Sequence, residues 1–333
     1  MTRNKTTVFL VTIGLLCIAP LLLSNFQVSI LTEILIFAIF ALSLNILVGY
    51  TGLVSLGHAA FFAVGAYTAG IVAKSVSTNL ILTLLAAILI SVIVAAIIGF
   101  FSTKVSGFYF LMLTLAFSQM IYSIVHQSFN LTGGTNGLSG IPNPTIIGDV
   151  SFASNLSIYF LVLVGFILVW LFLRTFLKSP LGQILVGIRE NEPRMKAMGY
   201  NTMLYKNLAF IIAGGLGGVA GSLYSYFNGF VAPSEAYWTM SGQVLIMVLI
   251  GGAGTLIGPV LGAAFIVGLE TIVSAYTDLL MLIIGSVFIL FVIFAPKGIV
   301  GIATSIYERF MEKRRAIHKQ TPSPNVVKTV EKD

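Results

Sequence analysis

Residues 177–206, LKSPLGQILVGIRENEPRMKAMGYNTMLYK, stand out because almost everything on either side of them is apolar. These 30 residues carry five basic and two acidic side chains, and a stretch of this length and polarity does not lie in lipid. Its pattern of charges, proline and glycine is too ordered for a simple linker. We interpret it as a cytoplasmic loop that carries a short docking helix.

The composition of the whole chain indicates a membrane protein. Of the 333 residues, 57% are hydrophobic and 9% are charged, whereas a soluble domain has about 25% charged residues. Lipid is therefore the solvent for most of the chain, and the predicted fold class is an all-α polytopic membrane bundle. We expect a transmembrane domain over residues 1–300, which includes the loop 177–206, and a charged cytoplasmic tail over residues 301–333.

Apolar runs long enough to cross a bilayer number about ten, since a crossing needs about 20 residues. They are Val8–Ser24, Ile30–Val48, Leu56–Ala73, Leu80–Phe101, Phe108–Val125, Leu156–Phe176, Leu208–Phe227, Gln243–Ile250 (a short one), Gly258–Ala275 and Leu279–Phe294. The loops 127–156 and 228–239 contain no lysine or arginine, which places them outside the cell and both termini inside. Lys104 and the central loop obey this scheme, whereas Lys74 violates it.

The net charge of +7 is explained by the same scheme. The basic residues gather in the central loop and the tail, and no basic face is interleaved with aromatic residues. Cytoplasmic loops of a membrane protein therefore account for the excess better than nucleic-acid binding does.

Glycine-rich interruptions divide two of the apolar runs. LVGYTGLVSLG at residues 47–57 precedes HAAFFAVG, and LIGGAGTLIGPVLG at residues 249–262 precedes AAFIVG. The two segments align with small gaps. An internal duplication would produce such an alignment, and Gly/Ala/Leu-rich membrane segments also align in this way by chance. Non-helical backbone at membrane depth must be buried in protein or line a cavity. The interruptions therefore predict the translocation pathway, with Gly49, Gly52, Gly251 and Gly254 as candidate residues.

Two titratable residues complete the set of pathway candidates. His58 follows the first interruption, where a pathway role and a role in helix packing are both open. Glu270 lies inside the ninth span, and an acid there costs about 2.5–3.5 kcal/mol on insertion scales. It is therefore either functional or held by the outer interface or by a hydrogen bond within the bundle.

The central loop contains the start and stop signals of a short helix. Asn191 is a plausible N-cap, Glu192 and Pro193 suit the first turn, and Gly199 is placed to end the helix. The helix would have about two turns, too few to be stable alone.

The same short helix carries features of a binding surface. Met195 and Met198 fall on one face at i,i+3 spacing, with Arg194 and Lys196 around them. A soft methionine face with charged flanks suits a groove on a partner protein. The alternative is a solvated helix packed on its own membrane domain.

Several kinds of chemistry are absent from the sequence. There is no GxxxxGK[ST] motif for ATP phosphates, no HExxH motif and no metal-ligand spacing, so we expect no cofactor and no ATPase site in this chain. The single cysteine, Cys17, excludes a disulfide framework and a thiolate metal site. No series of acidic residues and histidines crosses the membrane spans, which argues against a proton pump.

Three long motifs, in order, carry a resemblance to a known family. They are SLNILVGYTGLVSLGHAAFFAVGAYTAG at residues 43–70, LTGGTNGLSGIP at 131–142 and GQILVGIRENEPRMKAMGYN at 182–201. The chain resembles, over about residues 34–298, the LivM type of permease subunit in bacterial ATP-binding-cassette importers for branched-chain amino acids.

The resemblance implies a coupling helix that contacts an ATPase, and it places Arg189, Glu190, Asn191, Glu192 and Gly199 in that helix. It implies ATP-binding subunits, a second permease subunit and an extracytoplasmic substrate-binding protein as partners, in a bacterial inner membrane. It also implies a fold like that of type II importers such as the vitamin B12 importer, and an alternating-access mechanism.

Two other classes remain open at this stage. A secondary transporter driven by an ion gradient would work as this chain alone, and the interrupted helices are compatible with it. A structural subunit without a pathway would need the glycine interruptions for assembly only. The importer requires a separate ATPase, which separates it from both, and related importers carry urea or short amides instead of leucine, isoleucine and valine.

Overall fold

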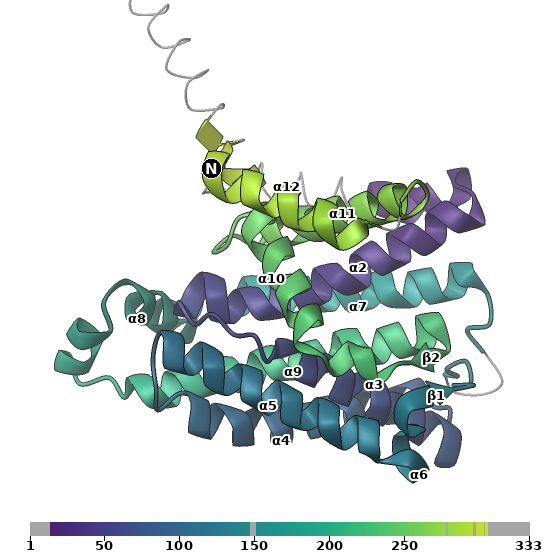
Figure 1. The fold of residues 1–333 in the computed structure, drawn as a ribbon, viewed down its shortest axis with the longest axis horizontal. Coiled ribbons are helices and arrows are strands. Elements are labelled where there is room, and N and C mark those ends of the chain that lie inside the picture. Colours follow the sequence, from purple (N-terminus) through teal and green to yellow (C-terminus); the bar gives the residue numbers. More distant parts are fainter. Residues whose placement is uncertain (1–13, 147–150, 278, 296–297, 303, 306–333) are drawn as a thin grey trace, which may run out of the picture.

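The computed structural model describes residues 14–146, 151–277, 279–295, 298–302 and 304–305, and it is built almost entirely of helices (Figure 1). The long helices are α2 (Asn25–Asn45), α3 (His58–Ser75), α4 (Leu80–Ser102), α5 (Phe108–Gln127), α7 (Asn155–Phe176), α8 (Pro180–Ala197), α9 (Thr202–Asn228), α10 (Trp238–Gly251), α11 (Ile257–Ser274) and α12 (Leu280–Phe294). The short elements are the π-helix η1 (Ile46–Thr51), α6 (Phe129–Thr132), η2 (Gly134–Asn136), η3 (Pro233–Ala236) and the strands β1 (Leu138–Ser139) and β2 (Phe230–Val231).

The prediction of an all-α polytopic membrane bundle is confirmed. Within the described residues, seven helical stretches are long and apolar enough to cross a membrane. They are Asn25–Thr51, Leu80–Ser102, Phe108–Gln127, Asn155–Phe176, Thr202–Asn228, Ile257–Ser274 and Leu280–Ile302. The helix α3 and the 14-residue α10 occupy two further expected spans but are not among the seven. The expected span 8–24 lies partly outside the described residues, and most of the expected tail 301–333 does too.

Polar side chains set where several of these helices begin. Ser24 precedes α2, where its Oγ accepts a hydrogen bond from Gln27 N (3.4 Å) and its N–H donates to Gln27 Oε1 (3.0 Å). Asn79 precedes α4, and its Oδ1 accepts from Ile81 N (3.0 Å) and Leu82 N (3.3 Å). These bonds satisfy N–H groups that have no partner within the helix, which matters most where water is excluded.

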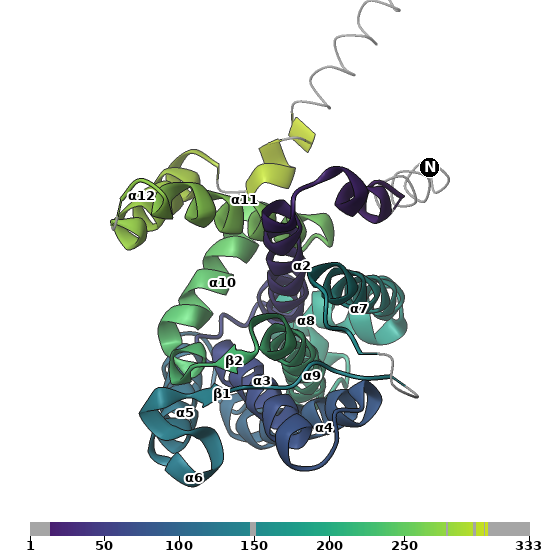
Figure 2. The ribbon, with the colours of Figure 1, turned by 90° about the vertical axis from the view of Figure 1, so that its right-hand side faces the viewer.

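The helix α9 lies at the centre of the bundle, packed against α2, α3 and α4 (Figure 2). Its glycines allow this close packing. A Cβ at Gly221 would overlap the carbonyl group of Phe62 in α3, and one at Gly218 would overlap the side chain of Ser91 in α4. Small residues of this kind let helix backbones approach each other in membranes, where van der Waals packing is a main source of association.

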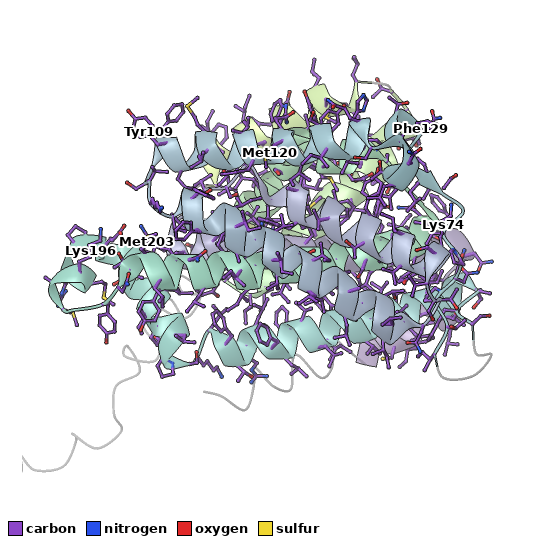
Figure 3. All side chains as sticks on the ribbon, turned by 90° about the horizontal axis from the view of Figure 1, so that it is seen from below. Lys74, Tyr109, Met120, Phe129, Lys196 and Met203 are labelled. Carbon is purple, nitrogen blue, oxygen red and sulfur yellow. The ribbon has the colours of Figure 1, made fainter. Side chains whose placement is uncertain are left out.

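The two ends of the bundle carry different structures. Lys196 and Met203 lie at the α8 end, and Lys74 and Phe129 at the opposite end (Figure 3). At that opposite end the loops 127–156 and 228–239 meet, because β1 pairs antiparallel with β2 through Leu138 and Val231. The two loops, which the charge rule predicts to be outside the cell, thus lie at the same end of the bundle. Lys74, which breaks the charge rule, donates a hydrogen bond there to Ser139 O (2.7 Å).

Candidate functional site

The central polar stretch folds as the kinked helix α8. Ser179 Oγ accepts from Gly182 N (3.4 Å) and Pro180 is the first helical residue, so α8 begins 11 residues before the predicted N-cap, Asn191. The kink falls at Asn191, whose φ of −159° and ψ of 91° are not helical. Asn191 Oδ1 accepts from Arg194 N (3.0 Å), so the predicted N-cap is confirmed for the second half of α8.

Gly199 ends this second half as predicted. Its φ of +87° is left-handed, a conformation that glycine adopts without cost. Beyond it, Tyr200 N donates to Met195 O (3.1 Å) and Gly199 N donates to Lys196 O (3.0 Å), which is the hydrogen-bond pattern of a glycine C-terminus.

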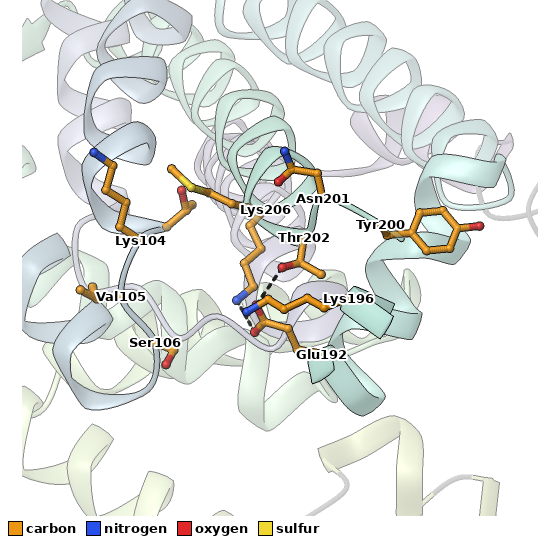
Figure 4. A pocket seen from close by; sticks show the side chains of 11 residues that line it. Lys104, Val105, Ser106, Glu192, Lys196, Tyr200, Asn201, Thr202 and Lys206 are labelled. Carbon is orange, nitrogen blue, oxygen red and sulfur yellow. Dashed lines mark hydrogen bonds and ion pairs between the residues drawn. The ribbon is translucent and has the colours of Figure 1, made fainter. Parts of the chain in front are cut away.

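Glu192 is the centre of an ion-pair cluster that joins α8 to the start of α9 (Figure 4). Its carboxylate accepts from Lys206 Nζ (2.5 Å) and Thr202 Oγ1 (3.0 Å), and Lys196 Nζ lies 3.1 Å away. The Lys206 side chain is only 5% exposed, so this carboxylate compensates a nearly buried cation. Burial raises the pKa of Glu192, but the hydrogen bonds from Lys206, Lys196 and Thr202 outweigh it and bring the pKa below its ordinary value.

A polar cavity of about 320 Å³ lies beside this cluster, between the turn after α4 and the turn before α9 (Figure 4). Lys104, Lys196 and Lys206 line it together with Glu192. Three cations and one carboxylate give the cavity a net positive charge.

The side chains around the kink differ in how exposed they are. Glu190, Arg194, Lys196 and Met198 are exposed, and Met198 retains 61% of its accessible surface. Met195 instead lies against α8 itself, because a Cβ at Gly187 would be 2.8 Å from its Sδ. The structure therefore separates the two methionines, which the sequence placed on one binding face, since the kink at Asn191 folds the second half of α8 back over the first.

Arg189 is exposed as well, but one end of its side chain reaches toward the bundle. Its Nη1 donates a hydrogen bond to Gly49 O in η1. A Cβ at Gly52 would lie 3.2 Å from Arg189 Cγ, and one at Gly254 would lie 2.9 Å from Arg189 Nη1. The side chain thus fits between three of the glycines that the sequence singled out.

These contacts occur where the two glycine-rich interruptions meet. Asn45 bridges them, since its Nδ2 donates to Thr255 O (2.8 Å) and its Oδ1 accepts from Gly254 N (2.9 Å). Gly49 has no room for a side chain between Asn45 and Gly254. We call this contact between residues 45–52 and 254–255 the junction. It brings Gly49, Gly52 and Gly254 together, whereas Gly251 packs against Gly258 between α10 and α11.

The other two pathway candidates have their hydrogen-bond partners outside the junction. His58 is fully buried, with its Nε2 2.7 Å from Ser43 Oγ and its ring stacked on Phe40, and its Nδ1 has no hydrogen-bond partner within the described residues. Glu270 lies 13 residues along α11 from its start and accepts a hydrogen bond from Gln243 Nε2. A hydrogen bond within the bundle, one of the two explanations considered for this acid, is therefore present.

Four features of the site were not predicted: the start of α8, the π-helix, the Asn45 bridge and the pairing of Glu192 with Lys206. Ser179-Pro180 is a local signal for the first of them. The Asn45 bridge joins segments about 210 positions apart, which no local pattern indicates.

The chain has apolar helices that can cross a membrane, glycine interruptions in two of them and a charged helix at one end. These features place it in the class of polytopic membrane transport subunits. A family profile described as "Branched-chain amino acid transport system / permease component" matches residues 26–294. The chain belongs to this family.

Curated relatives agree with the family match. The high-affinity branched-chain amino acid transport system permease protein LivM of Salmonella typhimurium is 30% identical over 318 residues, covering 89% of this chain and 75% of the relative. LivM of Escherichia coli K12 gives the same identity and coverage. A probable LivM of Methanocaldococcus jannaschii is 28% identical over 279 residues, covering 72% of this chain and 79% of the relative. No solved structure matches the chain significantly.

Proposed function

We propose that this chain is the membrane subunit of an ATP-driven importer and forms the path by which leucine, isoleucine or valine crosses the membrane. The observation that carries this proposal is the family match over residues 26–294, supported by relatives that are named as branched-chain amino acid permeases. The interrupted helices around the junction are the kind of backbone that membrane proteins place beside a pathway.

ATP hydrolysis takes place, in this proposal, in separate ATP-binding subunits that dock on the second half of α8. The docking segment is residues 190–199, with Glu190, Arg194 and Met198 exposed to a partner. Glu192 and Gly199 fix the shape of the segment, and Met195 packs it against Gly187 in the first half of α8. ATP binding and hydrolysis then drive an alternating-access cycle.

The orientation follows from charge. The α8 end, with its lysines, faces the cytoplasm of a bacterial cell across the inner membrane, and both termini lie on that side. The β1–β2 end faces outward and receives substrate from an extracytoplasmic binding protein. A second, related permease subunit completes the pathway. The full chain makes about ten crossings in a type II importer arrangement, in which the two glycine interruptions derive from an internal duplication.

The pathway includes the junction, and its candidate residues are Gly49, Gly52 and Gly254 there and Gly251, His58 and Glu270 outside it. Glu270 is proposed to be functional because it lies inside a membrane span and its hydrogen-bond partner, Gln243, carries no charge that would compensate a carboxylate.

The test is co-purification from native membranes followed by transport in vesicles containing the partners found. We expect an associated ATPase, and uptake of radiolabelled leucine that needs both ATP and an external binding protein. Uptake of urea or a short amide in place of leucine would change the substrate class only. Purification as a single chain with uptake driven by an ion gradient would overturn the importer.

A further inference from the structure

Arg189 differs from the other charged residues of α8 in the direction of its side chain. Arg189, Arg194 and Lys196 are all exposed residues, but Arg189 differs from the other two because its Nη1 reaches into the junction and donates to Gly49 O. This bond uses only part of the guanidinium, which has five N–H donors, and it ties α8 to the bundle. The contact therefore points to a positioning role, whether or not the rest of the exposed side chain meets a partner.

The carbonyl that Arg189 binds lies at the irregular end of a membrane helix. The helix α2 ends in the π-helix η1, and the chain then turns so that Leu53 N donates to Leu47 O (2.9 Å). Carbonyl groups in the last turn of a helix need donors from outside the helix. Arg189 supplies one to Gly49 at a π-helical turn, which is a common feature of functional sites.

The same guanidinium also lies against the second interruption. A Cβ at Gly254 would be 2.9 Å from its Nη1, and Gly254 is held to α2 by Asn45. One side chain of α8 therefore contacts the end of α2 and the turn between α10 and α11. These segments are far apart in sequence and pack together through α2, α10 and α11.

We propose that Arg189 is a positioning residue that passes the movement of α8 to the junction through its contacts with Gly49 and Gly254. This inference rests on the proposed function, because it assumes that the α8 end receives that subunit. A planar guanidinium with fixed donor directions suits the role better than a flexible ammonium group. When α8 is displaced, α2 and the α10–α11 turn are displaced with it.

The experiment uses the complete importer, purified with its ATP-binding subunits and reconstituted with its binding protein. The variants are Arg189→Ala and Arg189→Lys. The control is Lys178→Ala, which removes one cation from an exposed position beside α8. Three quantities are measured for each: co-purification of the ATP-binding subunit, ATP hydrolysis with loaded binding protein, and leucine transported per ATP.

We expect Arg189→Ala to keep the ATP-binding subunit and to hydrolyse ATP, while leucine transported per ATP falls at least about tenfold, as for the loss of a hydrogen bond from a charged group. Arg189→Lys retains a charged hydrogen-bond donor group and should recover part of the leucine transported per ATP. Lys178→Ala should match the unchanged protein.

Two results would overturn the inference. One is loss of the ATP-binding subunit from Arg189→Ala with an unchanged ratio of transport to hydrolysis, which would make Arg189 a docking residue. The other is a normal ratio in both Arg189 variants. If the unchanged protein shows no ATP-driven uptake, the proposed function itself fails, and that outcome is distinct from a failure confined to the variants.

Discussion

Glu192 at the α8 end and Glu235 at the β1–β2 end are both withdrawn from solvent, but their partners differ. Glu192 is held by two lysines, which bring its pKa below the ordinary value in spite of burial. Burial raises the pKa of Glu235 to about 7, the charge of Glu33 adds to the rise, and a hydrogen bond from Tyr224 Oη (3.0 Å) opposes it.

The difference shows how each end is stabilised. The α8 end keeps its carboxylate ionised because cations compensate it, and the ion pairs fix the turn between α8 and α9. At the opposite end burial outweighs the hydrogen bond from the neutral Tyr224 hydroxyl, so the Glu235 carboxyl binds a proton near neutral pH. The Glu192 carboxylate thus keeps its charge at the end where we propose that a partner docks, whereas the Glu235 carboxyl at the other end is partly protonated near neutral pH.

The largest effect is expected from reversing the charge at the α8 end. Glu192→Lys would place a third ammonium group against Lys196 and the nearly buried Lys206. Because breaking a buried ion pair leaves a cation uncompensated, ATP-driven leucine uptake should fall more than about tenfold while membrane insertion persists. Uptake in vesicles and the amount of inserted protein are the measurements. Gln183→Lys, which adds a cation at an exposed position of α8, is the control, and equal uptake in both variants would contradict the role of the cluster.

A smaller effect is expected from Glu235→Gln. The carboxyl ionises near pH 4.5 in the unfolded chain and near pH 7 in the folded one, so stability falls as pH rises between these values. Glutamine stays neutral, and the variant should lack this decline, a difference of up to about 3 kcal/mol at pH 8. Thermal unfolding in detergent at pH 5 and pH 8 measures it.

The dependence of stability on pH is expected to have the opposite sign at Glu192. Because the folded pKa of Glu192 is lowered, its stabilising contribution is present above about pH 4.5 and is lost as pH falls through the folded value. Glu192→Gln should therefore lose stability at neutral pH and match the unchanged protein in acid. An identical pH profile for Glu235→Gln and Glu192→Gln would remove the distinction between the two ends.

The smallest effect is expected from Gly199→Ala. Gly199 has a φ of +87° and open space around it, so a methyl group costs only the left-handed conformation, about 1–2 kcal/mol. The second half of α8 should fray, and Tm should fall by about 2–4 °C for each kcal/mol. Gly242→Ala, in a helical position that is also open, should be neutral or slightly stabilising. Equal effects in both would show that the left-handed residue does not hold the end of α8.

Local signals in the sequence were sufficient for the membrane class, most of the helices and the short helix between Asn191 and Gly199. These depend on runs of apolar residues, caps and charge, which act over a few positions. The start of α8 at Pro180 was not predicted, although a serine followed by a proline is a local signal for the start of a helix.

The arrangement of the site depends on contacts that periodicity does not encode. Arg189 and Gly49 are 140 positions apart, and Asn45 and Thr255 are 210 apart. The sequence identified both interruptions and the charged loop, yet it did not show that all three meet. The packing of Met195 on Gly187 follows likewise from the kink at Asn191, which reverses the face that a straight helix would present.

Photo-crosslinking in cells tests the central claim, that the α8 end meets the ATP-binding subunit. Benzoylphenylalanine would be placed at Met198, which is 61% exposed at the α8 end, and at Phe129, which is 68% exposed at the opposite end (Figure 3). We predict an adduct with an ATP-binding subunit from position 198 and none from position 129. An adduct with that subunit from position 129 and none from position 198 would contradict the account.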